Sequence, residues 1–323
     1  MKNDPMKKIA DALLGAESID IVTHIMMDGD AIGSAVALCL ALRKEGKTAN
    51  VIIEDNVAEY LRFLEYGCVT DLTEAAGSSD VCVALDCGTK SRFPKRTAIF
   101  DSAKLRICVD HHQTTEPIAD LNYIEPESAA TGELVYALIR EMGTEIDKDI
   151  ASCIFAAIAT DTGNFMYSNT TKRSHEVVID LYDTGFDAYS VSVQLYENEP
   201  YRKIALHGDV VSRAERLADG KIIMAKVSRE LLDSHGADFE DTEGIVSILR
   251  SISGVEVAAL VKEKKKDEIK VSLRSKEYVD VAKVASGFEG GGHKRAAGCT
   301  IRKDLDSAYE DIKAALEKET CRG

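Results

Sequence analysis

The sequence predicts an α/β protein in which a parallel-sheet domain is joined through a helical linker to a smaller α/β domain. In the first half, β-like apolar runs alternate with helix-like segments, which is typical of a parallel sheet with crossover helices. Residues 171–218 show a helical pattern with few strand signals, and beyond them the alternation restarts. A length of 323 residues also fits two domains. We expect domain limits of 1–188 and 219–323, with the linker at 189–218.

The elements of the first domain follow from the period of the apolar residues. A period of two over a short run indicates a strand, and a period of three to four over a longer run indicates a helix. Strands are expected at Ile19–Thr23, Asn50–Ile53, Asp80–Leu85 and Lys104–Val109, and helices at Ala31–Lys44, Ala58–Glu65, Thr131–Met142 and Ile150–Ala159.

The same reasoning gives the elements of the second half. Tyr201–Leu217 is expected to be a solvated connecting helix, and the charged run Lys262–Asp267 a hairpin turn between two strands. Strands are expected at Lys221–Val227, Val255–Val261 and Glu268–Leu273, and helices at Thr242–Ser251, Val279–Ser286 and Leu305–Lys318.

The composition narrows the class of protein. With 45% apolar and 29% charged residues and no apolar run near the ~18 residues that span a bilayer, a soluble cytoplasmic protein without membrane contact is expected. A net charge of −15 disfavours long duplex nucleic acid as a partner. The absence of Trp also argues against a surface that stacks extended single strands. Any nucleic-acid substrate should therefore be short.

Several apolar runs end in aspartate or histidine. Because the ligand crevice of an open α/β sheet lies at the carboxyl ends of the strands, these side chains are expected to converge. Three strands and one apolar helix contribute to the set, which comprises His24, Asp28, Asp30, Asp86, Asp110, His111, His112 and Asp161.

Clustered carboxylates repel one another unless cations neutralise them, so divalent metal ions are expected. Aspartate and histidine without cysteine suit Mn²⁺, with Mg²⁺, Fe²⁺ or Co²⁺ as alternatives. Two such ions can clamp an in-line displacement at phosphorus and lower the pKa of a shared water. Taken singly, each residue also has a structural interpretation: Asp30 can cap a helix, and Asp28, Asp86 and Asp161 can form turns.

These motifs resemble the DHH phosphoesterase superfamily in order and spacing. The resemblance rests on Thr23–Ser34, Asp86, Val109–His112 and Thr160–Phe165, and Gly290–Gly298 resembles the signature of the DHH-associated domain. The architecture is similar to that of NrnA-type oligoribonucleases. The resemblance implies an active site in the cleft between the domains, hydrolysis of very short RNA to mononucleotides and of 3′-phosphoadenosine 5′-phosphate (pAp) to AMP, and a homodimer.

The resemblance also implies a role for each residue. His24, Asp28 and Asp86 would bind one metal ion, and Asp30, Asp86, His111 and Asp161 the other, with Asp86 bridging them. Asp110 would orient a histidine, and His112 would face the substrate phosphate. The sequence departs from the family at Met26-Met27, where Asn-Pro is usual, which bears on the stiffness of that loop.

A glycine cluster in the second domain is the candidate for substrate binding. Consecutive glycines can aim several backbone N–H groups at one anion, and a loop of this kind can hold the non-reacting phosphate or sugar. The structural alternative for the glycine cluster is a flexible turn. The alternative for Arg274 is an ordinary exposed arginine at the end of a strand. Residues 187–218 are the expected hinge. The expected substrate-binding residues are Arg274, Gly291, Gly292, His293, Lys294 and Arg295.

Other functions remain open at this point. A phosphodiesterase for cyclic di-AMP or its linear product pApA would share the same motifs, and a nucleotide-binding sensor could retain the metal site without turnover. A RecJ-type nuclease is disfavoured because the chain is short and acidic. A pyrophosphatase of this superfamily is disfavoured by the glycine-histidine signature.

Overall fold

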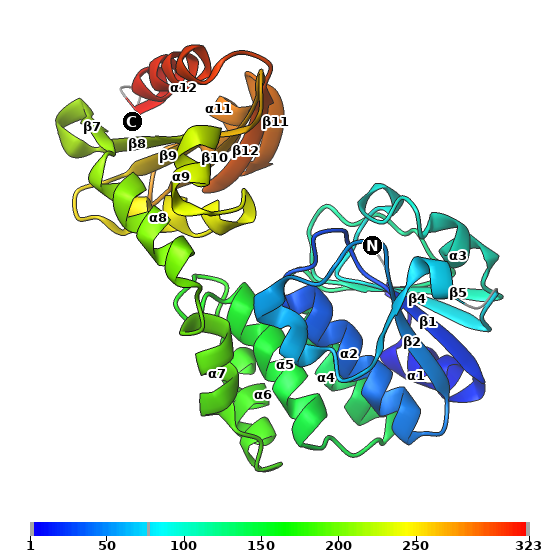
Figure 1. Cartoon of the computed structure of the whole chain (residues 1–323). Coiled ribbons are helices and arrows are strands. Elements are labelled where there is room, and N and C mark those ends of the chain that lie inside the picture. The colour runs from blue at the N-terminus through cyan, green and yellow to red at the C-terminus, as the bar shows by residue number, and fades with distance from the viewer. Residues whose placement is uncertain (1–2, 76–77, 321–323) are drawn as a thin grey trace. The chain divides into compact units, whose positions relative to one another are not determined.

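A computed structural model describes residues 3–75 and 78–320, which form two compact units, one ending at Asn198 and one beginning at Glu199. The expected α/β class is confirmed, with a parallel sheet in the first unit and a second sheet in the other (Figure 1). The boundary between the units falls inside the expected linker, and the domain limits themselves stay predictions. None of the helices in the described residues is long and apolar enough to cross a membrane.

The described part of the first unit contains a six-stranded parallel sheet with the order β3-β2-β1-β4-β5-β6. The chain moves outward from β1 in one direction and returns beside it at β4, so a crevice opens at the carboxyl ends of these two strands. The strands are β1 (Ser18–Val22), β2 (Thr48–Ile53), β3 (Val69–Asp71), β4 (Val81–Leu85), β5 (Leu105–Asp110) and β6 (Leu121–Ile124).

Helices flank this sheet (Figure 1). One expected helix is different: Ala58–Glu65 forms a 3₁₀ helix over Glu59–Leu64, in which Leu61 and Leu64 are the buried residues and are three apart, the period of a 3₁₀ helix. The helices are α1 (Met6–Gly15), α2 (Gly29–Lys44), α3 (Thr97–Ser102), α4 (Thr131–Met142), α5 (Lys148–Asp161), α6 (Lys172–Tyr182) and α7 (Ala188–Tyr196).

Glycines let α2, α4 and α5 pack closely, side by side in Figure 1. A Cβ added at Gly29 would lie 2.4 Å from the side chain of Thr160, and one at Gly33 would lie 2.5 Å from the carbonyl oxygen of Cys153. A Cβ at Gly132 would lie 2.6 Å from Cβ of Ala157. This close approach brings together the starts of α2 and α4 and the end of α5.

The second unit has a six-stranded sheet, in its described part, with the order β11-β12-β10-β9-β8-β7. Two apolar cores lie against it: one contains residues of α11 and α12, and the other contains residues of α8, α9 and α10. The elements are α8 (Tyr201–Ser212), β7 (Glu215–Leu217), β8 (Ile222–Val227), α9 (Arg229–His235), α10 (Ile245–Ser251), β9 (Val257–Lys265), β10 (Glu268–Ser275), α11 (Val281–Ser286), β11 (Glu289–His293), β12 (Ala296–Ile301) and α12 (Leu305–Thr320).

Three expectations for the second unit are wrong in detail. The turn between β9 and β10 is only Lys266-Asp267, because both strands continue beyond the core as a two-stranded ribbon whose charged side chains reach water. The connecting helix ends at Ser212, and Glu215–Leu217 pairs with β8 instead. The glycines 290–292 lie in the edge strand β11 rather than in a loop, because every residue of β11 pairs with β12.

Candidate active site

The predicted site residues converge at the carboxyl ends of β1, β4 and β5. Each of these strands ends in, or leads directly into, a member of the set, and the start of α2 and the end of α5 supply the rest. Three overlapping groups have ligand atoms within 4.8 Å of one another: His24, Asp28 and Asp86; Asp30, His111 and Asp161; and Asp86, His111 and His112.

Backbone carbonyls fix the orientation of two histidines. Nδ1 of His24 lies 2.8 Å from the carbonyl oxygen of Ile25, and Nδ1 of His111 lies 3.1 Å from that of Ser128. Because a carbonyl oxygen only accepts hydrogen bonds, each Nδ1 donates a proton, and each Nε2 is left to face the site. Both histidines are therefore oriented to bind a cation through Nε2.

These Nε2 atoms face carboxylate oxygens. Nε2 of His24 lies 3.5 Å from Oδ2 of Asp86 and 3.6 Å from Oδ2 of Asp28. Nε2 of His111 lies 3.6 Å from Oδ1 of Asp86 and 3.5 Å from Oδ2 of Asp161. The two oxygens of Asp86 thus point to different histidines, which is the arrangement of a carboxylate shared between two cation sites.

Asp30 is held by the N-terminus of α4. The N–H of Thr131 donates to its Oδ2 (2.7 Å), and the N–H of Gly132 and the hydroxyl of Ser34 donate to its Oδ1 (both 2.9 Å). The hydroxyl of Thr131 also donates to Oδ1 of Asp86 at 3.0 Å. Sequence reasoning missed Thr131 and Gly132; the available signal was that a helix expected to begin at residue 131 has free N–H groups for an anion.

Asp110 organises the two histidines that follow it. It is fully buried, and its Oδ1 accepts hydrogen bonds from the backbone N–H of His111 and from Nδ1–H of His112, both at 2.8 Å. Its Oδ2 accepts from the hydroxyl of Thr115. The hydrogen bond from His112 raises the pKa of that imidazole to about 9, although burial opposes the shift. These contacts hold both histidines in place, and the orienting role of Asp110 stays a prediction.

Burial and the clustering of carboxylates shift the pKa values of several groups in the site. Burial and the charges of Asp86 and Asp161 raise the pKa of Asp30 well above its usual range. Burial also raises the pKa of Asp161 to about 6, against the effect of His111. Burial lowers the pKa of His24, but Asp28 and Asp86 outweigh it and raise the value to about 10. These shifts, together with an oxygen and nitrogen donor set, fit divalent cations.

The loop that departs from the family pattern is nonetheless fixed. Met26 has a left-handed backbone with φ 54°, and its N–H donates to Oδ2 of Asp55 at 2.5 Å. The side chain of Met27 is buried in the core. Asp86 also has a positive φ, 56°, which is unfavourable for a residue with a Cβ and is common at functional sites.

The expected substrate-binding residues of the second unit divide between two faces and a turn. Arg274 pairs with Ala296, which pairs with His293, so Arg274 and His293 lie on one face of the sheet with Gly291. Gly292 lies on the opposite face, where an added Cβ would be 2.6 Å from the carbonyl oxygen of Ala296. The remaining two, Lys294 and Arg295, form the exposed turn between β11 and β12.

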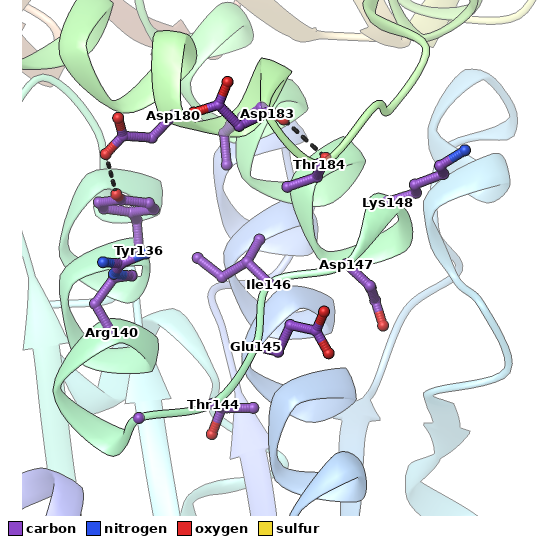
Figure 2. Close-up of a pocket in the computed structure, with 12 residues that line it drawn as sticks. Tyr136, Arg140, Thr144, Glu145, Ile146, Asp147, Lys148, Asp180, Asp183 and Thr184 are labelled. Atoms are coloured by element: carbon purple, nitrogen blue, oxygen red, sulfur yellow. Dashed lines mark hydrogen bonds between the residues drawn. The ribbon is translucent and has the colours of Figure 1, made fainter.

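A separate pocket of about 910 Å³ lies at the other end of α4. Figure 2 shows that Tyr136 and Arg140 line it from α4, with Asp147 and Lys148 near the start of α5. None of the predicted site residues lines it, and Arg140 is nine residues along α4 from Thr131, roughly 14 Å at 1.5 Å per residue. The aspartate–histidine cluster is therefore the candidate active site.

Comparisons with known proteins agree with this geometry. Residues 18–158 match the DHH family, N-terminal domain, and residues 219–319 match the DHHA1 domain. The bifunctional oligoribonuclease and PAP phosphatase NrnA of Thermus thermophilus is 33% identical over 99% of this chain and 95% of its own length. The chain belongs to the DHH family.

Further proteins are similar to this chain over most of their length. The bifunctional oligoribonuclease and PAP phosphatase NrnA of Bacillus subtilis is 25% identical over 88% of this chain and 90% of its own. The crystal structure of an exopolyphosphatase-related protein from Bacteroides fragilis has a TM-score of 0.91 and 27% identity, and the match covers 97% of this chain and 95% of that one. In this DHH protein, Asp110-His111-His112 is the tripeptide that ends β5 and begins the loop after it.

Proposed function

We propose that this DHH protein is a metal-dependent phosphoesterase that hydrolyses very short RNA to mononucleotides and pAp to AMP. The observation that carries the proposal is the pair of aspartate–histidine groups that share Asp86 at the crevice between β1 and β4. The substrates are taken from the relatives named as bifunctional oligoribonuclease and PAP phosphatase, one of them 33% identical over almost the whole chain.

The proposal assigns a metal ion to each group. His24, Asp28 and Asp86 would hold one ion, and Asp30, Asp86, His111 and Asp161 the other. Mn²⁺ is the first choice for this oxygen and nitrogen donor set, with Mg²⁺ or Co²⁺ as alternatives. When bound, the two ions would supply activated water and charge neutralisation at the phosphoryl oxygens.

The protein's own residues would position and stabilise the reacting group. The N-terminus of α4 holds both oxygens of Asp30, so that carboxylate cannot rotate away from Asp161 and His111. Asp110 holds Nδ1–H of His112 and stabilises its imidazolium form, which leaves Nε2–H to donate to a phosphoryl oxygen. The side chain of His112 is 43% exposed, so this nitrogen is accessible to a substrate.

The second unit would bind the part of the nucleotide that does not react. Arg274, Gly291 and His293 share one face of its sheet, and an arginine guanidinium can bind two phosphate oxygens at once. The formal charge of −15 disfavours grip on a long polyanion, which supports a short substrate. The proposal excludes long duplex nucleic acid for this reason.

Two further parts of the proposal concern the cellular compartment and the oligomeric state. The described cysteines are all free and buried, which suits a reducing compartment such as the cytoplasm. The family resemblance supports a homodimer, and analytical ultracentrifugation tests it directly.

The test is release of mononucleotide from a 5′-labelled RNA dinucleotide and of phosphate from pAp, with added Mn²⁺. The wild type is expected to hydrolyse both substrates, and Asp86→Ala neither. Asp183→Ala, a control on the exposed end of α6, should leave both rates unchanged. Hydrolysis of cyclic di-AMP when neither of these substrates is hydrolysed would move the function to that alternative. Nucleotide binding without any turnover would make the protein a sensor.

A further inference from the structure

Glu133 is a fully buried glutamate that the proposed function does not use. It is the third residue of α4, and its side chain is 0% exposed. A buried carboxylate costs free energy unless hydrogen-bond donors or cations compensate for the lost water. The first turn of a helix contributes, because the helix dipole is positive there. The donors around Glu133 supply the rest, and their positions show which segments this carboxylate holds.

Donors reach Glu133 from two segments. The hydroxyl of Ser128 donates to Oε2 at 2.9 Å, and the backbone N–H of Ala129 donates to the same oxygen at 3.4 Å. From α6, the hydroxyl of Ser174 donates to Oε1 at 2.6 Å, and Nε of Arg173 lies 3.6 Å from Oε2. The contacts with α6 alone would tie α4 to α6. The contacts with Ser128 and Ala129 fix, in addition, the segment between β6 and α4.

Ser128 also contacts the candidate active site. Its carbonyl oxygen accepts a hydrogen bond from Nδ1–H of His111 at 3.1 Å. Ser128 therefore presents its hydroxyl to Glu133 and its carbonyl to His111. With Nδ1 held in this way, Nε2 of His111 faces Asp86 at 3.6 Å and Asp161 at 3.5 Å. A rotation of the Ser128 peptide would release the histidine, and the hydrogen bond to Glu133 opposes that rotation.

The hydroxyl of Ser128 has one proton and two acceptors within reach. These are Oε2 of Glu133 and the carbonyl oxygen of Ala130, at 2.9 and 3.0 Å. A carboxylate is a stronger acceptor than a peptide carbonyl. Without the carboxylate, the hydroxyl would turn to Ala130, and the N–H of Ala129 would lose its acceptor in a buried place. The backbone that holds His111 would then be free to shift.

We propose that Glu133 is a positioning residue: through the hydroxyl of Ser128 it fixes the carbonyl that holds His111, and it thereby sets how tightly the His111 group binds its metal ion. The inference rests on the proposed function, which assigns an ion to that group. Glu133 acts without touching the ion. Residues that support metal ligands from behind commonly change metal affinity by about 10- to 100-fold, and the lower end applies here because Glu133 acts through Ser128.

The first test titrates the metal-free protein with Mn²⁺ alone and follows binding by calorimetry. The wild type is expected to bind two ions. Glu133→Met keeps the length of the side chain but is a poor acceptor, so it should weaken one ion about tenfold and leave the other unchanged. Glu133→Gln should bind like the wild type, because its amide oxygen can turn to Ser128 while its N–H donates to the hydroxyl of Ser174. Glu141→Met, on an exposed position of α4, is the matched control and should change neither ion.

A double-mutant cycle separates positioning from general packing. Ser128→Ala removes only the hydroxyl that links Glu133 to the backbone, and it should weaken the same ion about tenfold. If Glu133 acts through that hydroxyl, the double variant should bind no more weakly than either single variant. Losses that multiply in the double variant, an equal loss at both ions, or unchanged binding by Glu133→Met would overturn the inference.

A measurement without metal distinguishes this failure from failure of the proposed function. In metal-free protein with ¹⁵N-labelled histidine, the Nδ1–H signal of His111 is assigned by its loss in His111→Gln. Its exchange with water should be about tenfold faster in Glu133→Met than in the wild type or Glu133→Gln, because the hydrogen bond to Ser128 opens more often. Equal exchange rates would overturn the inference. A wild type that binds no Mn²⁺ would instead overturn the proposed function.

Discussion

Oδ2 of Asp86 lies 3.5 Å from Nε2 of His24. Its other oxygen lies 3.6 Å from Nε2 of His111, so one carboxylate connects the two aspartate–histidine groups. Asp86 takes this position because it directly follows β4, which neighbours β1, and because its backbone adopts φ 56°. The predictions below concern the contacts that hold this arrangement and the packing that surrounds it.

The hydroxyl of Thr131 is expected to tune metal affinity. It donates to Oδ1 of Asp86, and groups that hydrogen-bond to metal ligands typically change affinity by about 10- to 100-fold. Thr131→Val should therefore require that much more Mn²⁺ for half-maximal hydrolysis of pAp, with kcat largely recovered at saturation. Thr131→Ser keeps the hydroxyl and serves as the control. If Thr131→Val and wild type need the same Mn²⁺ concentration, the hydrogen bond does not support the site.

Close helix packing in the first unit is expected to depend on Gly33. A Cβ there would lie 2.5 Å from the carbonyl oxygen of Cys153, a backbone atom that cannot move aside without moving α5. Gly33→Ala should destabilise the protein by about 1–3 kcal/mol, as overpacking does. Urea unfolding of the full chain measures this.

The control for Gly33 is Gly208, which lies in α8 with no atom within 4 Å of an added Cβ. Gly208→Ala should stabilise the protein by up to about 1 kcal/mol through helix propensity alone. Equal effects of the two substitutions would show that the close approach of α2 and α5 is not limiting.

Asp80 is expected to make stability depend on pH in the acid range. A hydrogen bond from Lys104, and others from the N–H groups of Glu17 and Ser18, lower the pKa of Asp80 to about 2. Its folded pKa is below the unfolded value of 3.8, so its contribution is complete above the unfolded pKa and is lost as the pH falls through about 2.

Asp80→Asn should therefore lower the melting temperature by the same amount at pH 7 and pH 5, and the difference from wild type should shrink below pH 4. Asp183→Asn, on the exposed end of α6, provides the charge-matched control and should change little at any pH. A deficit that stays constant down to pH 3 would contradict the role assigned to the Asp80 carboxylate.

The convergence of the site could be predicted because it depends on local features. Each of His24, Asp86 and Asp110 lies at or just beyond the end of an apolar run, and the carboxyl ends of parallel strands share one edge. The role of Thr131 could not be predicted in this way. Its contact with Asp30 joins residues 101 apart in the chain and exists only because α2 and α4 pack closely.

Features of the second sheet were harder to predict for a related reason. Gly290–Gly292 has the composition of a loop, yet it forms an edge strand because β12 supplies its hydrogen bonds. Short strands such as β3 and β6 carry few buried residues, so their apolar pattern is weak. Lys262 was expected to begin a charged turn, and only its pairing with Lys270 shows that it lies within β9.

The central claim is that Asp86 is shared by two metal ions in a phosphoesterase. The most direct measurement is the number of Mn²⁺ ions bound per chain, followed by metal titration of wild type and Asp86→Ala, with pAp hydrolysis recorded on the same samples. The account predicts two ions per wild-type chain, fewer in the variant, and loss of hydrolysis together with the metal. Two ions in Asp86→Ala, or full hydrolysis by that variant, would contradict it.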